Sequence, residues 1–120
     1  MGIFDKLFGK GEPSDSLRVQ PKQAVLVHLN GSDLDQSIYD ENDLSTIEDL
    51  LIAKLDGTGL GEFDGNEVGN YEAILYLYGD DAEKLFDRVE PVLRGYPLCQ
   101  KAKVIIRQGE PGAVQREVTL

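Results

Sequence analysis

The residues between Asp56 and Glu67 have the types, and part of the spacing, of a calcium-binding loop. The segment reads DGTGLGEFDGNE. The calcium-binding loop of an EF-hand needs oxygen ligands at fixed positions and glycine at the sixth position. Asp56, Gly61, Asp64 and Glu67 fit the first, sixth, ninth and twelfth positions, but Leu60 fails at the fifth. The next segment also has the pattern of a strand and not of a second helix. We favour a glycine-rich turn region whose acids cap turns, with a divalent-cation site at Asp56, Asp64 and Glu67 as an alternative.

His28 is the one histidine of the chain, and an imidazole beside a carboxylate can act as a general base. Glu72 would lie across from it on a neighbouring strand, with Tyr76 and Tyr78 along the same face. These four residues define a ligand-pocket hypothesis. However, no Ser or Cys is flanked by a recognisable nucleophile motif, and the carboxylates form no paired catalytic pattern. We therefore favour a structural His28 and expect neither a catalytic residue nor a cofactor.

Two apolar segments predict the central strands of a sheet. Residues 71–79, YEAILYLYG, are rich in Tyr, Ile and Leu, which suits a pleated and largely buried strand. Residues 24–30, AVLVHLN, form a second such strand. A short strand within 61–69 and strands over 102–108 and 116–120 complete the sheet, and the last of them would pair back as a hairpin.

Two helices are predicted between these strands. The first covers about 45–56 and begins with a capping box, in which Ser45 and Glu48 satisfy the first free amides. The second begins at Asp80, because acidic residues in a first turn complement the helix dipole. Pro91 removes one hydrogen bond inside it, so we expect a kink or a restart there.

This order of elements, β-α-β-β-α-β with an additional C-terminal strand, predicts an α+β ferredoxin-like fold, in which two helices cover one face of an antiparallel sheet. The predicted helix-side core consists of Val25, Val27, Leu29, Leu50, Leu51, Leu55, Ala73, Leu75, Leu77, Leu85, Phe86, Val89, Val104 and Ile106. The opposite face would present Leu26, His28, Glu72, Ile74, Tyr76, Tyr78, Lys103, Ile105 and Arg107. Such a face is too apolar to be left in water. We expect the N-terminal segment, a second copy or a partner to cover it.

Length and composition predict one domain over residues 19–120, preceded by an amphipathic segment and linker over 1–18. The N-terminus does not match a myristoylation motif, because Lys6 occupies the position that requires Ser or Thr. No apolar run approaches the ~20 residues that span a bilayer, and no secretory signal is recognisable, so we expect a cytoplasmic protein. The single Cys99 cannot form an internal disulfide and fits a small semi-buried hydrophobe.

The net charge of −10 is distributed unevenly along the chain. Fifteen acids and one base, Lys54, lie between Gln23 and Glu83, whereas residues 84–120 hold seven bases and four acids. The acidic part would repel phosphates, so we expect no nucleic-acid binding. A basic protein or a divalent cation would be attracted. Alternatively, the acids simply keep a small domain in solution.

The stretch GLGEFDGNEVGNYEAILYLYGDDAEKLFDRVEPVLR, about a third of the chain, also resembles a motif of small uncharacterised bacterial proteins. In these the pattern G-x-G-E-F-D-G-N-E-x-G is followed by an apolar strand, then by Y-G-x-D-A-x-x-L-F and E-P-V-L. The resemblance implies a bacterial origin and a ferredoxin-like fold. It carries no activity over to this chain.

Three functional hypotheses follow. The first is a non-enzymatic module that engages a basic protein, for example as an immunity protein or inhibitor, through Asp40, Glu41, Asp43, Glu62, Asp64, Tyr76 and Tyr78. The second is a small enzyme or ligand-binding protein that self-associates as a dimer, with a pocket around His28. The third is a divalent-cation-binding protein. A concave pocket around His28 would favour the second hypothesis, and salt-sensitive binding would favour the first.

Overall fold

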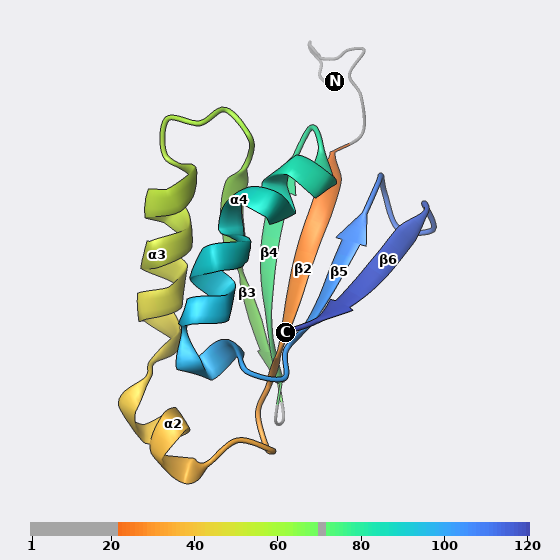
Figure 1. The fold of residues 1–120 in the computed structure, drawn as a ribbon. Helices are drawn as coiled ribbons and strands as arrows, with labels where there is room; N and C mark the ends of the chain where they lie inside the picture. Colours follow the sequence, from red (N-terminus) through yellow and green to blue (C-terminus); the bar gives the residue numbers. More distant parts are fainter. Residues whose placement is uncertain (1–21, 70–71) are drawn as a thin grey trace, which may run out of the picture.

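A computed structural model describes residues 22–69 and 72–120 (Figure 1). Over these residues the chain forms a five-stranded antiparallel sheet and three α-helices, which confirms the predicted α+β class. The elements in chain order are β2 (Gln23–Asn30), α2 (Gln36–Glu41), α3 (Leu44–Leu55), β3 (Glu62–Gly69), β4 (Glu72–Gly79), α4 (Ala82–Gly95), the 3₁₀ turn η1 (Pro97–Cys99), β5 (Lys103–Arg107) and β6 (Gln115–Thr119).

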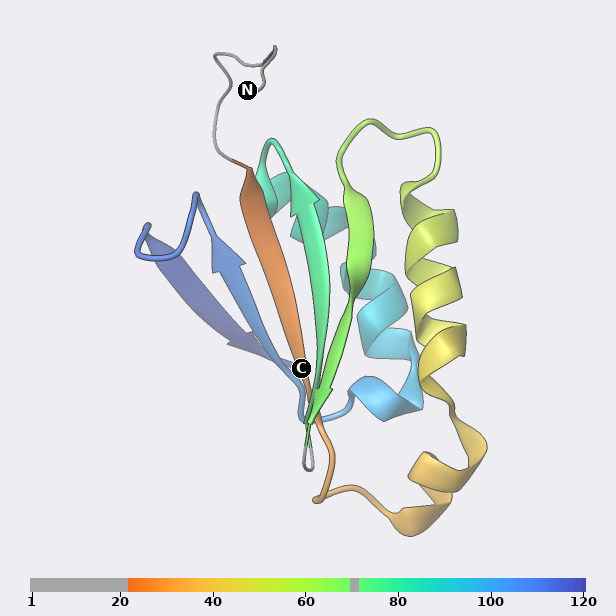
Figure 2. The same cartoon turned by 180° about the vertical axis from the view of Figure 1, so that it is seen from behind.

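The strands lie in the order β3-β4-β2-β5-β6, and every neighbouring pair is antiparallel. The two segments predicted as central strands, β2 and β4, are both internal and pair along their whole length. The C-terminal segment forms the predicted hairpin with β5 and becomes an edge strand. The helices α3 and α4 lie together on one face of the sheet, and the opposite face carries no described helix (Figures 1 and 2).

The core lies between the two long helices and the inner positions of the strands. Alternate residues of β2 and β4 point into it, as the period of a strand requires. Helix α3 contributes Ile47, Leu51 and Leu55, which are spaced by one turn. Leu50, which we predicted to be a core residue, is instead 42% exposed, because the buried stripe of α3 passes through its neighbour Leu51.

The start of α3 differs from the predicted capping box. Asp43 is the N-cap, and its carboxylate accepts a hydrogen bond from the amide of Thr46 at 3.1 Å. Ser45 lies inside the first turn, and Glu48 receives a hydrogen bond from the Asn66 side chain on β3. An aspartate at the N-cap is at least as good an acceptor as serine, so the helix begins one residue before the predicted position.

Three further details of the elements differ from the predictions. Strand β3 is eight residues long and not short, with a register shift between Phe63 and Asn66. Helix α4 begins at Ala82, after an N-cap at Asp81, and continues through Pro91 to Gly95 without a restart. The short helix α2 was not predicted, because only Ile38 and Tyr39 among its six residues are partly buried, which is too little to produce a helical apolar period.

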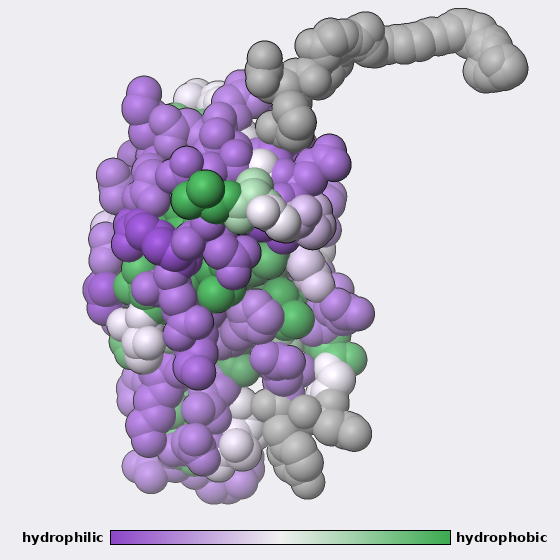
Figure 3. All heavy atoms as spheres, turned by 90° about the vertical axis from the view of Figure 1, so that its right-hand side faces the viewer, coloured by the Kyte–Doolittle hydropathy of each residue, from purple (hydrophilic) through white to green (hydrophobic). Residues whose placement is uncertain are grey.

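The predicted amphipathic segment and linker over 1–18 lie outside the described residues. Within the described ranges, no helix has the length and hydrophobicity needed to cross a bilayer. Figure 3 looks onto the side of the molecule formed by β6 and shows small apolar patches separated by hydrophilic atoms. Strand β6, with the sequence QREVT, is therefore a charged edge, which discourages pairing with further strands.

Candidate functional site

The sheet face opposite the helices is the first candidate site. Strand pairing places its residues in three rows that run across the sheet. The first row is Glu62, Tyr78, Ala24, Arg107 and Gln115; the second is Tyr76, Leu26, Ile105 and Glu117; the third is Glu67, Ile74, His28, Lys103 and Thr119. The centre of this face is thus apolar and aromatic, whereas its β3 side is acidic and its β5 side is basic.

The central side chains of this face cover one another in part. Leu26, Ile74, Tyr76, Tyr78 and Ile105 are all half-buried. The rings of Tyr76 and Tyr78 stack with their centroids 6.5 Å apart and an angle of 13° between their planes. The Tyr76 hydroxyl donates a hydrogen bond of 2.7 Å to the Glu67 carboxylate, and this bond raises the pKa of Tyr76 above its usual value. The two tyrosines are therefore fixed in place, as the anchors of an interface would be.

His28 and Glu72 come together at one end of the same face, although Ile74 and not Glu72 lies directly across from His28, so the contact is diagonal. Their side chains meet at 3.1 Å, with the imidazole 30% exposed and the carboxylate 52% exposed. They border an open hollow of about 260 Å³ that also involves Lys101 and Lys103. Tyr76 and Tyr78 do not line this hollow, so the four residues of the ligand-pocket hypothesis share a face but not a pocket.

The two lysines of this hollow were not predicted as site residues. Lys101 lies in the loop before β5 in a left-handed conformation, with φ of 62°, and its ammonium group donates a hydrogen bond to the carbonyl oxygen of Asp33 at 3.2 Å. Folding brings the loop that contains Lys101 next to the loop that contains Asp33, and no local sequence pattern predicts this contact. Lys103 was placed on the correct face by its strand position, across from His28.

The second candidate site is the flank of the molecule formed by residues 31–69, which include α2, α3 and β3. These residues hold eleven carboxylates and one base, Lys54. Ten of the carboxylates are exposed, and Glu48 is half-buried. No ion pair joins any of the eleven to a basic side chain in the described part of the chain. We call these residues the acidic flank.

The acidic residues predicted to bind a partner fall into two groups on this flank. Asp40 and Glu41 lie on α2 and Asp43 caps the start of α3, whereas Glu62 and Asp64 lie on β3, after the end of α3. A twelve-residue helix spans roughly 18 Å, so the two groups lie at opposite ends of the flank and not in one cluster. Tyr76 and Tyr78 lie on the neighbouring sheet face, where Tyr78 is directly across from Glu62.

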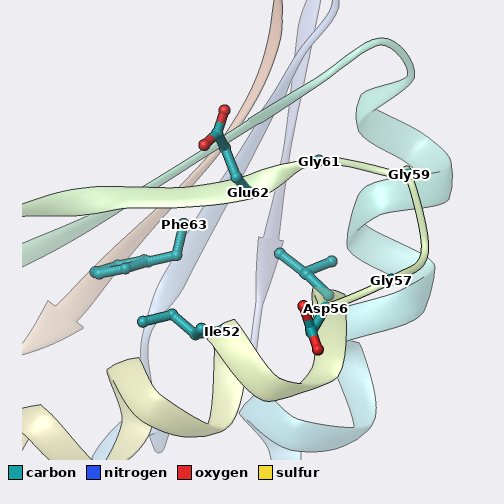
Figure 4. A pocket seen from close by; sticks show the side chains of 8 residues that line it. Ile52, Asp56, Gly57, Gly59, Gly61, Glu62 and Phe63 are labelled. Carbon is teal, nitrogen blue, oxygen red and sulfur yellow. The ribbon is translucent and has the colours of Figure 1, made fainter.

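A groove of about 430 Å³ lies between the end of α3 and the start of β3. Figure 4 shows Ile52 and Phe63 pointing toward one another across its floor, while the Glu62 side chain points away on the other side of β3. Asp56 lies at the end of α3 beside the groove, and the loop that follows contributes three glycines to the lining. The groove therefore has an apolar floor and one acidic residue at its rim.

The residues of the cation-site alternative do not converge. Within residues 22–69 and 72–120 there is no group of three or more His, Cys, Asp or Glu side chains that could hold a metal ion. Glu67 is held by Tyr76 on the open sheet face, and Asp56 lies beside the groove. The geometry therefore gives no support to a site formed by Asp56, Asp64 and Glu67.

Cys99 is buried in the core, and burial raises the pKa of its thiol to about 12. A thiol that stays protonated is a poor nucleophile. The Cys99 side chain is 1% exposed and packs among the core side chains, which agrees with the small hydrophobe predicted from the sequence.

Comparisons of the chain with protein-family models, with curated proteins and with solved structures find no match.

Proposed function

We propose that this protein is a binding module that engages a basic protein through the acidic flank, as an inhibitor or an immunity protein would. The observation that carries the proposal is the set of eleven carboxylates over residues 31–69, none of which forms an ion pair with a described basic side chain. A concentration of charges of one sign produces a field that attracts an oppositely charged surface and speeds the encounter.

The groove between α3 and β3 supplies a place where such a partner would be anchored. Its floor of Ile52, Leu55 and Phe63 accepts the aliphatic part of a lysine or arginine side chain, and Asp56 accepts the charged end. Ile52 is 51% exposed, so an apolar contact there removes surface from water. The charge of the flank raises the rate of association with the partner, and the apolar contact in the groove lowers the rate of dissociation.

The test is retention of a partner from the native lysate by the tagged protein, compared at low and at moderate salt by quantitative mass spectrometry. A triple variant, Asp40→Asn/Glu41→Gln/Asp43→Asn, removes three charges and keeps an N-cap acceptor at position 43. We expect a basic protein that salt releases and that this variant retains roughly tenfold less well.

The matched control is Asp80→Asn/Asp87→Asn/Glu110→Gln, which removes the same charge outside the acidic flank. If the control weakens retention as much as the triple variant does, net charge alone governs the binding and the flank has no special role. Retention that is insensitive to salt would also contradict the proposal.

We also propose that the fold is the ferredoxin-like split βαβ with one added strand. The order β3-β4-β2-β5, with every pair antiparallel and both long helices on one face, supports this arrangement. Strand β6 extends the sheet beyond the four strands of that motif.

The hollow around His28 favours a second candidate function, the binding of a small ligand. Its specific support is the convergence of His28, Glu72, Lys101 and Lys103 around about 260 Å³ of open space. Titration of isotope-labelled protein with a library of small carboxylates and phosphates, followed by NMR, tests it. Shifts confined to the hollow and abolished by His28→Gln would support this function, and no shift at millimolar ligand would exclude it.

A further inference from the structure

The open sheet face has charges arranged so that it is complementary to a second copy of itself. Across the first row, Glu62 lies on β3 and Arg107 lies on β5, with Tyr78 and Ala24 between them. The third row repeats this order with Glu67 on β3, then Ile74 and His28, and finally Lys103 on β5. Both rows therefore carry an acidic residue on β3 and a basic residue on β5, although the centre of the third row also holds His28, and each row continues to an uncharged residue on β6.

We propose that two copies of this chain pack these faces together around a two-fold axis that runs parallel to the strands, between β4 and β2. This axis places β3 of one copy over β5 of the other, and β4 over β2. Glu62 then faces Arg107 of the other copy, and Glu67 faces Lys103. Glu62 and Glu67 also belong to the acidic flank, but the dimer is argued from strand register and requires no basic partner.

The charges select this axis over the other two-fold axis available in the plane of the face. An axis that runs across the strands exchanges the first and third rows, so Glu62 would face Glu67 and Arg107 would face Lys103. Like charges brought together at an interface are unfavourable. The axis parallel to the strands pairs opposite charges in both rows.

The central side chains fit the same axis. Tyr76 faces Leu26 of the other copy, and each of these side chains is only half-buried within its own chain. Ala24 is fully buried and contributes no accessible surface. Tyr76 and Leu26 supply apolar area at the centre, and the charged pairs form the rim, as in other protein interfaces. The rim pairs set the register of the two faces more than they add affinity.

Twist of the sheets does not break this match. Facing sheets cross at about 30°, and strands lie about 4.8 Å apart. The charged residues are about 7 Å from the axis and about 7 Å along the strands from the centre of the face, so the crossing shifts each pair by about 5 Å. Side chains as long as Glu, Lys and Arg can bridge that displacement.

The test uses the full-length chain and sedimentation velocity over a range of concentrations, with three variants: Glu67→Lys, Lys103→Glu and both together. Either single variant brings like charges together twice in the dimer, and we expect each to raise the dimer dissociation constant at least tenfold. The double variant restores opposite charges, and so does an equimolar mixture of the two single variants. We expect dimers with the original dissociation constant in both of these samples.

Within one chain Glu67 and Lys103 are separated by three strand spacings, roughly 14 Å. Recovery in the mixture therefore reports contacts between chains and not a repaired contact within one. Asp49→Lys, on the exposed side of α3, makes the same charge change away from the face and should leave the dimer unchanged.

A second measurement needs no variant. In a sample mixed from labelled and unlabelled wild-type chains, isotope-filtered NMR should show contacts between Tyr76 of one copy and Leu26 of the other. A wild-type chain that stays monomeric at millimolar concentration overturns the proposal. A dimer that ignores both reversals, or single variants that do not associate when mixed, overturns it as well. Glu67 belongs to the acidic flank, but that flank is tested at Asp40, Glu41 and Asp43, none of which lies on the open sheet face. Failure of the dimer therefore leaves the proposed function standing.

Discussion

Asp43 is a residue with both a structural and a proposed functional role. Its carboxylate accepts hydrogen bonds from the side chain and the amide of Thr46, and these bonds hold the pKa of Asp43 below its usual value. The same carboxylate belongs to the acidic flank, where it faces solvent. The sequence placed Asp43 in a binding surface but assigned the cap to Ser45, because the segment NDLSTIE offers two acceptors at plausible spacing.

The lowered pKa of Asp43 predicts a pH-dependent contribution to stability. Because the folded-state pKa is depressed, the stabilisation is complete above the unfolded-state pKa and is lost as pH falls through the folded-state pKa. We expect Asp43→Ala to lower the urea midpoint at pH 7, with the difference from wild type shrinking as pH falls below about 4. Asp49→Asn provides a control for loss of charge in the same helix outside the cap. A constant difference between pH 7 and pH 3 would contradict this account of the cap.

At the scale of elements, the end of β4 and the start of β3 approach too closely for a side chain. A Cβ added at Gly79 would lie 2.1 Å from the carbonyl oxygen of Leu60, and one added at Gly61 would lie 2.3 Å from that of Tyr78. Backbone would have to move to accept either. The packing of backbones therefore explains Gly61 in the glycine-rich turn region and Gly79 at the end of β4.

This close approach predicts that Gly79→Ala destabilises the fold. Overpacking against backbone typically costs about 1–3 kcal/mol, measured here as the free energy of unfolding in urea. Gly69→Ala is the matched control, because it is also at a strand end and its added Cβ meets nothing within 4 Å. We expect the control to unfold at the wild-type midpoint or slightly above it. Equal losses in both variants would mean that chain flexibility, and not contact, governs these positions.

The elements differ in how far the sequence could predict them. Strands β2 and β4 were predicted because their alternation is uninterrupted. Strand β3 was predicted to be short, because the register shift after Phe63 breaks its alternation and its residues are mostly exposed. Leu50 was assigned to the core because adjacent leucines on a helix both fit an apolar stripe by spacing, and only packing against the sheet decides which one is buried.

At the scale of the whole molecule, topology decides which distant residues meet. His28 and Glu72 are 44 residues apart, and strand pairing was enough to predict their contact. The contribution of Lys101 to the hollow beside them could not be predicted, since it depends on how two loops pass one another. The sequence also could not predict that the acidic residues fall into two separate groups, because α3 separates Asp40 from Glu62 by its full length.

The charge of the whole molecule predicts how its stability depends on salt. With a net charge of −10 and the acidic flank free of ion pairs to described bases, repulsion between carboxylates opposes the compact state. The Debye length falls from about 30 Å at 0.01 M salt to about 10 Å at 0.1 M, so added salt screens repulsion across the flank. We expect the melting temperature to rise by a few degrees when NaCl increases from about 10 to 300 mM.

The triple variant Asp40→Asn/Glu41→Gln/Asp49→Asn should melt at a higher temperature than wild type at low salt, and its melting temperature should change less with salt, because it has less repulsion to screen. Differential scanning calorimetry at fixed protein concentration measures both effects, and KCl should reproduce them, since screening depends on ionic strength and not on the ion. A melting temperature that falls with salt would show instead that attractive pairs dominate the electrostatics of the fold, and that the acids of the flank have partners that stabilise it.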